Sequence, residues 1–270
     1  MHLSRLASLA LLAVVSVAGG ASADQLDDIR KAGVLRAAVF DANPPFGLVD
    51  AKTHEIVGYD IDFAKAIAKK IGVKLELVPT NPANRIPLLQ SGKADLIVAD
   101  ATITPERKQV VDFSIPYFVS GQQFLVPVEA SDKVADFANA RFAAVKGTTE
   151  EQFIHATYPN AKVLAYDDIP LAFTALRNGS ADALTQDSSI LAGVLAKAPD
   201  KQKFKILPDL LTREEIGIGV KKGEAAVLAL VNETLIELEK SGEAEKIFDA
   251  WFGPSTAAPQ HRDFKISAGL

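Results

Sequence analysis

The sequence predicts an α/β protein with two similar lobes, each a mainly parallel sheet flanked by helices, which two chain crossings connect. Three observations lead to this prediction. Short apolar segments alternate with amphipathic helical segments from residue 34 onward, as in parallel sheets covered by helices. The same order of segments starts again near residue 141. The segments after residue 214 do not start a third unit, so we expect them to return to the first lobe.

The composition limits what such a protein can do. The chain has 270 residues, a formal charge of -5 and no cysteine. That length suits about one to two domains. The lack of cysteine excludes disulfides, cysteine-ligated metal sites and a cysteine nucleophile. The chain lacks the basic excess of proteins that hold nucleic acid or anionic membranes by charge, so we expect neither as a partner.

Residues 1–23 have the pattern of a cleaved signal peptide. Arg5 precedes a mostly apolar segment at 6–17, and Ala21 and Ala23 form a small-x-small cleavage pattern before Asp24. The apolar segment is shorter than the about 20 residues that span a bilayer, which disfavours the alternative of an uncleaved anchor. We therefore expect a mature chain that starts at Asp24 and lies in the periplasm.

The first lobe is expected to alternate three strands with two helices. Its helix at 60–71 has Asp60 as the expected N-cap, Ile61 and Ile67 on one apolar face, and Gly72 as the stop. The other helix, at 85–91, is short, and the strands are apolar runs bounded by polar, glycine or proline residues. The three strands lie at 34–40, 73–78 and 94–99.

The second lobe repeats this order. Its strands are expected at 141–146, 162–166 and 181–185, and its helices at 150–157 and 170–178. Residues 89–100 and 176–187 share a Leu, a Gly, an Ala and two Asp at the same spacing. A glycine that ends a helix ahead of a strand explains Gly92 and Gly179 by backbone conformation alone. The remaining matches indicate a repeated βαβ unit.

The C-terminal segments are expected to complete the first lobe with a strand at 215–221 and helices at 224–240 and 243–251. The first lobe would then comprise residues 24–121 and 214–270, and the second residues 122–213. Chain crossings near 120–124 and 213–219 would form a hinge. Residues 254–270 are expected to be a terminal extension, either docked or loose.

Arg107 is the first candidate binding residue. Ligands of open α/β sheets bind beyond the carboxyl ends of the strands, and Arg107 follows the strand at 94–99. Thr104 and Pro105 form an N-cap and first helical position, which places Arg107 in a first turn. A cation there is unfavourable unless it meets an anion. A surface arginine, or one paired with Asp112, is the alternative.

Two further strand ends carry polar candidates. Thr148 and Glu151 form a capping box after the strand at 141–146, and free N–H groups at such a helix start bind carboxylates. Asp187 ends the strand at 181–185, where a helix cap is the alternative role. Arg107 could grip a carboxylate, the N–H groups near Thr148 and Thr149 could complete that anion site, and Asp187 could take an ammonium. A free α-amino acid would thus bridge the lobes and favour their closure.

Short motifs occur in order along the chain at residues 44–47, 58–62, 89–92, 102–107, 111–114, 116–117, 146–149 and 251–253. Together they resemble the motifs of the polar amino-acid solute-binding proteins of ABC importers, bacterial extracellular solute-binding protein family 3. The resemblance implies a two-lobed periplasmic-binding-protein-like (type II) fold with a hinge, and docking of the closed form onto a membrane permease. We expect no cofactor and no metal. We expect a monomer.

The resemblance also implies roles for site residues. Arg107 would hold the ligand α-carboxylate with help from Thr102 and Thr149. Asp187 would hold the α-amino group, with help from the backbone carbonyl of Asp100.

Four further residues could contact the side chain of the bound amino acid. Arg85 resembles an arginine that reads acidic side chains, with an exposed helix residue as the alternative. Asp100 could neutralise Arg85, or bind a cationic or amide side chain. Phe40 and Phe46 could supply an apolar wall, although core packing is an alternative for Phe46. We expect a polar or charged L-amino acid, with acidic or amide side chains slightly favoured.

Two other functions remain open as alternatives. A periplasmic enzyme resembling cyclohexadienyl dehydratase shares the fold, and Asp100 with Asp187 could form an acid/base pair. The four histidines lack metal or triad spacing and no catalytic fingerprint occurs, so we expect no enzyme. A sensor domain is the third class, and it would need a membrane-spanning segment and a signalling module downstream.

Overall fold

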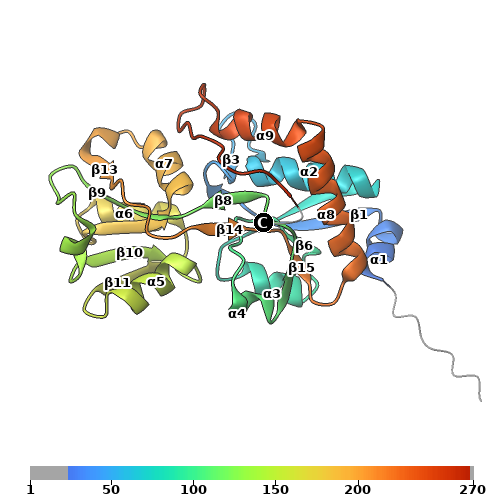
Figure 1. Ribbon diagram of the computed structural model, residues 1–270, viewed down its shortest axis with the longest axis horizontal. Coiled ribbons are helices and arrows are strands. Elements are labelled where there is room, and N and C mark those ends of the chain that lie inside the picture. Colours follow the sequence, from blue (N-terminus) through green and yellow to red (C-terminus); the bar gives the residue numbers. More distant parts are fainter. Residues whose placement is uncertain (1–23, 268–270) are drawn as a thin grey trace, which may run out of the picture.

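The computed structural model describes residues 24–267 and has two lobes that lie side by side (Figure 1). The predicted signal peptide lies outside the described residues. Lobe 1 is built on a five-stranded sheet of order β5-β1-β6-β15-β7, and lobe 2 on one of order β11-β10-β12-β9-β13. In both sheets the first three strands are parallel to one another. The fourth strand pairs antiparallel with both of its neighbours, the third and the fifth. This shared topology agrees with the repeat in the sequence.

The strand bounds of both main sheets follow. In lobe 1 they are β5 Lys74–Thr80, β1 Val34–Phe40, β6 Leu96–Ile97, β15 Gly219–Lys221 and β7 Val111–Phe113. In lobe 2 they are β11 Lys162–Tyr166, β10 Arg141–Val145, β12 Ala183–Asp187, β9 Gln122–Pro127 and β13 Phe204–Ile206.

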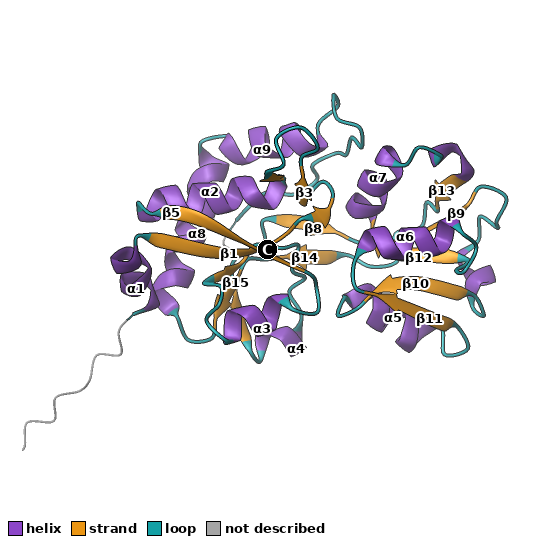
Figure 2. Ribbon diagram, turned by 180° about the vertical axis from the view of Figure 1, so that it is seen from behind, coloured by secondary structure: helices purple, strands orange, loops and turns teal. Residues whose placement is uncertain are grey.

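Helices cover both faces of each sheet (Figure 2). The lobe 1 helices are α1 Gln25–Ala32, α2 Tyr59–Ile71, α3 Arg85–Gln90, α4 Pro105–Lys108, α8 Ala225–Lys240 and α9 Glu243–Phe252. The lobe 2 helices are α5 Thr149–Thr157, α6 Ile169–Arg177 and α7 Ser188–Lys197, with short 3-10 turns at Val134–Phe137 and Lys201–Lys203. Within the described chain, no helix combines the length and apolar character that crossing a bilayer requires.

The two chain crossings are paired strands. β8 Phe118–Ser120 and β14 Glu214–Ile216 run antiparallel to each other between the lobes (Figure 1). A single strand at 215–221 was expected, but the structure divides it into β14 and β15, because the first part pairs with β8 and the second with β6 and β7. A small sheet of β2 Ala42–Asn43, β3 Gly47–Val49 and β4 Ile56–Val57 lies on lobe 1.

An aromatic cluster fills the core of lobe 1 beside the crossings. The ring of Phe46 lies 4.9 Å from that of Phe118 and 5.9 Å from that of Tyr59, and Phe252 packs against all three. Buried aromatic rings contribute large apolar areas to a core. The prediction that Phe46 lines the binding site is therefore wrong, because its fully buried ring belongs to this core.

The helix α2 begins differently from the prediction. Gly58 precedes it, and a Cβ there would lie 2.0 Å from the carbonyl oxygen of Phe46. Asp60 is not the N-cap. Its buried carboxylate accepts hydrogen bonds from the Tyr117 hydroxyl (2.6 Å) and the Asp100 N–H (2.9 Å). Asp60 thus ties the helix to the loop that follows β6.

The chain after α9 docks on lobe 1. Ile266 is buried, the ring of Phe264 lies 5.2 Å from that of Phe118, and Arg262 forms an ion pair with Glu239 on α8. Of the two expected forms of this extension, the docked one is present as far as residue 267.

Candidate functional site

The carboxyl ends of strands from both lobes meet around a small buried cavity. Its volume is about 10 Å³, which is room for about one water molecule. An amino acid is far larger, so a ligand can enter only when the lobes separate. The lining residues are Phe40, Asn43, Pro82, Arg85, Asp100, Thr102, Thr148, Thr149, Glu150, Gln186 and Asp187.

A larger groove adjoins this cavity along the contact between the lobes. It has a volume of about 710 Å³ and shares Phe40, Asn43 and Pro82 with the cavity. Lobe 2 contributes Val145 and Asp167 to its lining. The groove is therefore the outer part of the same interlobe cleft.

Arg107 links the lobes at the edge of the cavity. The Thr104 hydroxyl accepts the N–H of Arg107 (3.2 Å), and Pro105 occupies the first turn, as predicted. The guanidinium donates to the carbonyl of Thr102 in lobe 1 (2.9 Å) and to that of Gly147 in lobe 2 (3.1 Å). Its residue is 9% exposed, so the surface alternative is wrong.

The pairing of Arg107 with Asp112 is also wrong. Asp112 instead forms an ion pair with Lys222 at 2.6 Å. Asp112 lies in β7, and Lys222 directly follows β15, which is the neighbouring strand in the sheet. Because Asp112 has this local partner, Arg107 is left directed at the cleft.

The start of α5 has the predicted cap at Thr148, but Glu151 reaches back to the residue before the cap and not to Thr148 itself. Thr148 accepts the N–H of Glu151 (3.2 Å), and Glu151 accepts the N–H of Gly147 (2.8 Å). The Thr149 hydroxyl donates to Glu214 (2.8 Å), and the hydroxyl of Thr102 lies 3.5 Å from that of Thr149. Since these threonines come from different lobes, their contact belongs to the closed arrangement.

Asp187 occupies the N-cap position of α7 without acting as a cap. Its side chain makes no capping hydrogen bond, and its Oδ1 has no hydrogen-bond partner among residues 24–267. Burial, followed by repulsion from Asp100 and Glu214, holds the pKa of this carboxyl well above its usual range. Its unpartnered Oδ1 is therefore available to a cationic group in the cavity, whose charge would favour the ionised form of the carboxyl.

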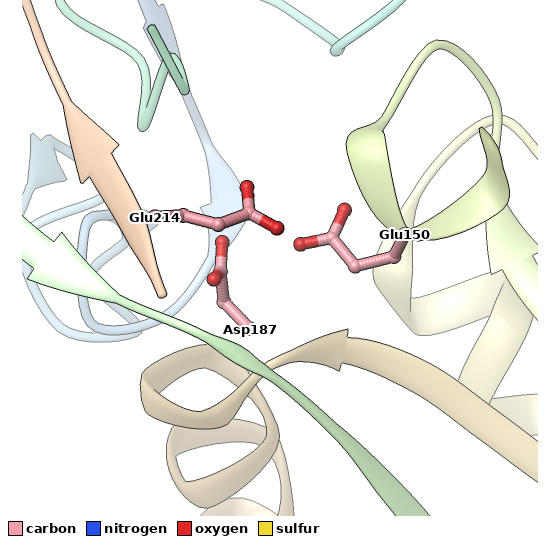
Figure 3. A group of neighbouring side chains, drawn as sticks. All are labelled: Glu150, Asp187 and Glu214. Atoms are coloured by element: carbon pink, nitrogen blue, oxygen red, sulfur yellow. The ribbon is translucent and has the colours of Figure 1, made fainter. Parts of the chain in front are cut away.

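Glu150 and Glu214 join Asp187 in a buried acidic cluster (Figure 3). One carboxylate oxygen from each of the three residues lies within 4.8 Å of the other two. Glu214 accepts hydrogen bonds from Thr149 and Thr212, whereas Oε1 of Glu150 has no partner within the described chain. Burial, then repulsion from Asp187 and Glu214, raises the pKa of Glu150. Such oxygens suit an ammonium or a hard metal cation.

Arg85 and Asp100 form the lobe 1 wall of the cavity. Nη1 of Arg85 donates to the carbonyls of Ala99 (2.7 Å) and Asp100 (3.0 Å), and its guanidinium carbon lies 5.6 Å from the Phe40 ring centre. Arg85 is 3% exposed, so the exposed alternative is wrong. Burial, then the neighbouring Arg107, lowers the pKa of Arg85 to about 9.

Asp100 has an unusual backbone. Its φ of 43° lies in the left-handed region, and its Oδ1 has no partner in the described part of the chain. Burial, then repulsion from Asp60, raises the pKa of the Asp100 carboxyl. Its backbone carbonyl, which the resemblance implied as a partner of the α-amino group, here accepts from Arg85.

The structure brings most predicted site residues together and adds two. The cavity lining includes Phe40, Arg85, Asp100, Thr102, Thr148, Thr149 and Asp187, with Arg107 at its edge. Sequence reasoning missed Glu150 and Glu214 as site residues. Glu150 was visible only as a helix-start acid. Glu214 lies in the segment near 213–219 that was expected to cross between the lobes. A charged residue in that segment was the one feature of the sequence that could have indicated a site role.

The fold and the interlobe cleft are those of a two-lobed solute-binding protein. The family model described as bacterial extracellular solute-binding proteins, family 3, matches residues 35–254, and the chain belongs to this family. It is 39% identical over 213 residues to the ABC transporter glutamine-binding protein GlnH of Bacillus subtilis, covering 76% of each chain. It is 31% identical to the L-cystine-binding protein TcyJ of Escherichia coli, covering 93% of this chain and 97% of that one.

A solved structure is also similar. The ancestral amino acid-binding protein AncCDT-1, described as a precursor of cyclohexadienyl dehydratase, superimposes with a TM-score of 0.77 and is 38% identical. The match covers 85% of this chain and 99% of that one. The two-lobed fold predicted from the sequence is thus confirmed.

Proposed function

We propose that this protein captures a free L-amino acid outside the cytoplasm and delivers it to the membrane permease of an ABC importer. One observation carries the proposal: opposite charges from the two lobes, Arg107 and Asp187, lie at one interlobe site. Burial lowers the pKa of Arg107, and the nearby acids Glu150, Glu214, Asp100 and Asp187 act against this, so Asp187 lies within electrostatic reach of the guanidinium. An α-amino acid supplies the complementary carboxylate and ammonium on one carbon.

Binding would begin in the open form. Opening removes the Gly147 carbonyl from Arg107, which frees a guanidinium donor for the ligand α-carboxylate. The hydroxyls of Thr102 and Thr149 lie beside this position and would donate to the same carboxylate. Asp187, brought up by lobe 2, would then accept the α-ammonium, so each lobe holds one end of the ligand.

Closure would occur about the paired crossing strands β8 and β14. We propose the lobe division 24–121 with 214–270 and 122–213, which puts both strands at or beside the boundaries. A ligand shifts an open/closed equilibrium only by binding one state better than the other. A zwitterion binds the closed state better than the open one, because its contacts with both lobes are complete only when the lobes meet.

We further propose that residues 1–23 are a cleaved signal, that the mature protein acts in the periplasm as a monomer, and that it is not an enzyme. The family and the relatives, which are transport binding proteins, support this proposal. The raised pKa values of buried Asp100 and Asp187 favour one alternative, because a general acid needs a raised pKa. Incubation with prephenate-like acids separates the two: we expect recovery of unaltered compound, and turnover would identify a dehydratase.

A thermal-shift screen tests the proposal directly. The panel is the twenty amino acids with cystine, ornithine and citrulline. A ligand at about 100 times its Kd stabilises the folded state by about 2.7 kcal/mol, which is readily measured as a rise in Tm. We expect at least one amino acid to raise the Tm. A flat response to the whole panel would contradict amino-acid capture.

A further inference from the structure

The site contains more buried acid than one α-ammonium needs. Four carboxyls, those of Asp100, Glu150, Asp187 and Glu214, are buried there, against the guanidinium groups of Arg85 and Arg107. Other buried acids in the described chain have partners of their own. Asp95 is paired with Arg36, and Asp60 accepts from Tyr117 and Asp100. The acidic excess is therefore a property of the site.

Hydrogen bonding shows the same imbalance. Oδ1 of Asp100, Oε1 of Glu150, Oδ1 of Asp187 and Oε1 of Gln122 are buried without a partner among the described residues. Gln122 lies at the same place, since its amide donates to the carbonyl of Glu150. The Gln122 oxygen is an acceptor in any state, and the three carboxyl oxygens are acceptors when ionised, the form that a bound cation favours. Buried acceptors without donors are costly, so the site is complementary to a ligand rich in N–H donors.

The two guanidinium charges offset only part of this excess, since four buried carboxyls face them. Nη1 of Arg85 already donates to two backbone carbonyls. Nη1 and Nη2 of Arg107 each donate to one backbone carbonyl. One ligand carboxylate suffices for the guanidinium that opening releases. A second carboxylate on the ligand would face Asp100 and Glu150 across a cavity with little water, where like charges repel strongly.

We propose that the ligand is an L-amino acid with a cationic side chain, of the lysine, ornithine or arginine kind. Asp187 takes the α-ammonium, and the free oxygens of Glu150 and Asp100 serve the second cation. The inference rests on the proposed function and replaces the slight preference for acidic or amide side chains. The acidic part of that preference came from Arg85, whose Nη1 donates to two backbone carbonyls in the structure.

Matched ligand pairs isolate the second charge. L-Arginine and L-citrulline have nearly the same shape but differ in charge, as do L-lysine and N6-acetyl-L-lysine. We expect titration calorimetry on the full protein to give at least about tenfold tighter binding of the cationic member of one pair. The wild-type comparison needs no variant and is independent of any folding defect.

Variants then locate the effect. Glu150→Gln keeps the size of the side chain but removes its charge, and we expect it to reduce the ratio of arginine to citrulline affinity by about tenfold. Asp100→Asn is a second probe, since asparagine tolerates the left-handed backbone. Glu215→Gln is the matched control: Glu215 adjoins Glu214 in β14, but its side chain is 39% exposed and it does not line the cavity. We expect this control to leave the ratio unchanged.

Three results would overturn the inference. Tighter binding of glutamine, glutamate or citrulline than of every cationic amino acid would exclude a cationic side chain. A rise in Tm with calcium or magnesium alone, abolished by Glu150→Gln, would assign the acidic cluster to a metal. Equal loss of the affinity ratio in Glu215→Gln would make the effect non-specific. In the first case amino-acid capture still holds, whereas failure of all amino acids to bind would reject the proposed function itself.

Discussion

Arg107 is held in place by its own helix turn, so its removal should affect binding more than folding. The cap of α4 is made by the Thr104 hydroxyl and the backbone N–H of Arg107, which any residue retains. We expect Arg107→Ala to weaken ligand binding by about 2 to 5 kcal/mol, because the buried carboxylate of the ligand loses its partner. Calorimetry measures the loss. Arg30→Ala, on the exposed side of α1, is the control, and unchanged affinity in Arg107→Ala would remove this residue from the site.

Asp187 presents the opposite charge, and its role can be separated from helix capping. A true cap costs about 1 kcal/mol or more when removed, but the Asp187 side chain makes no capping bond in the described structure. We expect Asp187→Asn to weaken binding strongly while the Tm of the ligand-free protein stays close to that of the wild type. A large fall of that Tm would instead assign Asp187 to the helix.

Asp60 should make stability depend on pH. Burial, only partly offset by its hydrogen bonds, raises the pKa of Asp60 from 3.8 to about 7. Between about pH 4 and pH 7 the folded protein then keeps a proton that the unfolded chain has lost, so the free energy of unfolding falls as the pH rises. The full effect is about 4 kcal/mol, and it levels off above the folded pKa.

The variant Asp60→Asn tests this slope. Its amide can accept from the Asp100 N–H and donate to the Tyr117 hydroxyl, so the local structure can be kept. Denaturant unfolding between about pH 4 and pH 8 should show a flatter dependence for the variant than for the wild type. Other buried carboxyls act with the same sign, so a residual slope is expected. Parallel slopes in both proteins would contradict a proton on Asp60.

At the scale of elements, the regular segments were predictable and their partners were not. The strand at 34–40 and the strand at 162–166 occur with the predicted bounds, because both are continuous apolar or alternating runs. The division of 215–221 into β14 and β15 was missed, since it depends on pairing with β8 and β6. Short antiparallel strands such as β13, three residues long, carry too little pattern to be identified.

Gly147 joins β10 to α5 and tests the contact between lobes. Its φ is +78°, and a Cβ would lie 2.9 Å from Cα of Ala83 in lobe 1. We expect Gly147→Ala to obstruct closure and so to weaken ligand binding. Separately, an alanine in the left-handed conformation lowers the stability of the fold by about 1 to 2 kcal/mol. The matched control is Gly179→Ala, with φ +75° and nothing within 4 Å of its Cβ. Both variants should lose similar stability, and equal ligand affinity in both would contradict the contact.

The whole molecule should become more compact when ligand binds. The site residues come from both lobes, and the cavity of about 10 Å³ is too small to admit an amino acid without separation of the lobes. We expect small-angle scattering to show a smaller radius of gyration with saturating amino acid than without it. Arg107→Ala, which lacks the carboxylate grip, should not contract at the same ligand concentration. A wild-type radius that ligand leaves unchanged would argue against closure about β8 and β14.

The sequence by itself determined the α/β class, the repeated lobes and the caps at Thr104 and Thr148, and it predicted Arg107 with Asp187 as a complementary pair. These follow from local periodicity, helix-end chemistry and charge at strand ends, which neighbouring residues decide. Only the tertiary structure decided that Phe46 belongs to the core, that Asp60 binds Tyr117 and Asp100, and that Glu150 and Glu214 join Asp187. Those outcomes depend on residues far apart in the chain. Burial and neighbouring charges shift the pKa of each carboxyl only after folding has brought these residues together.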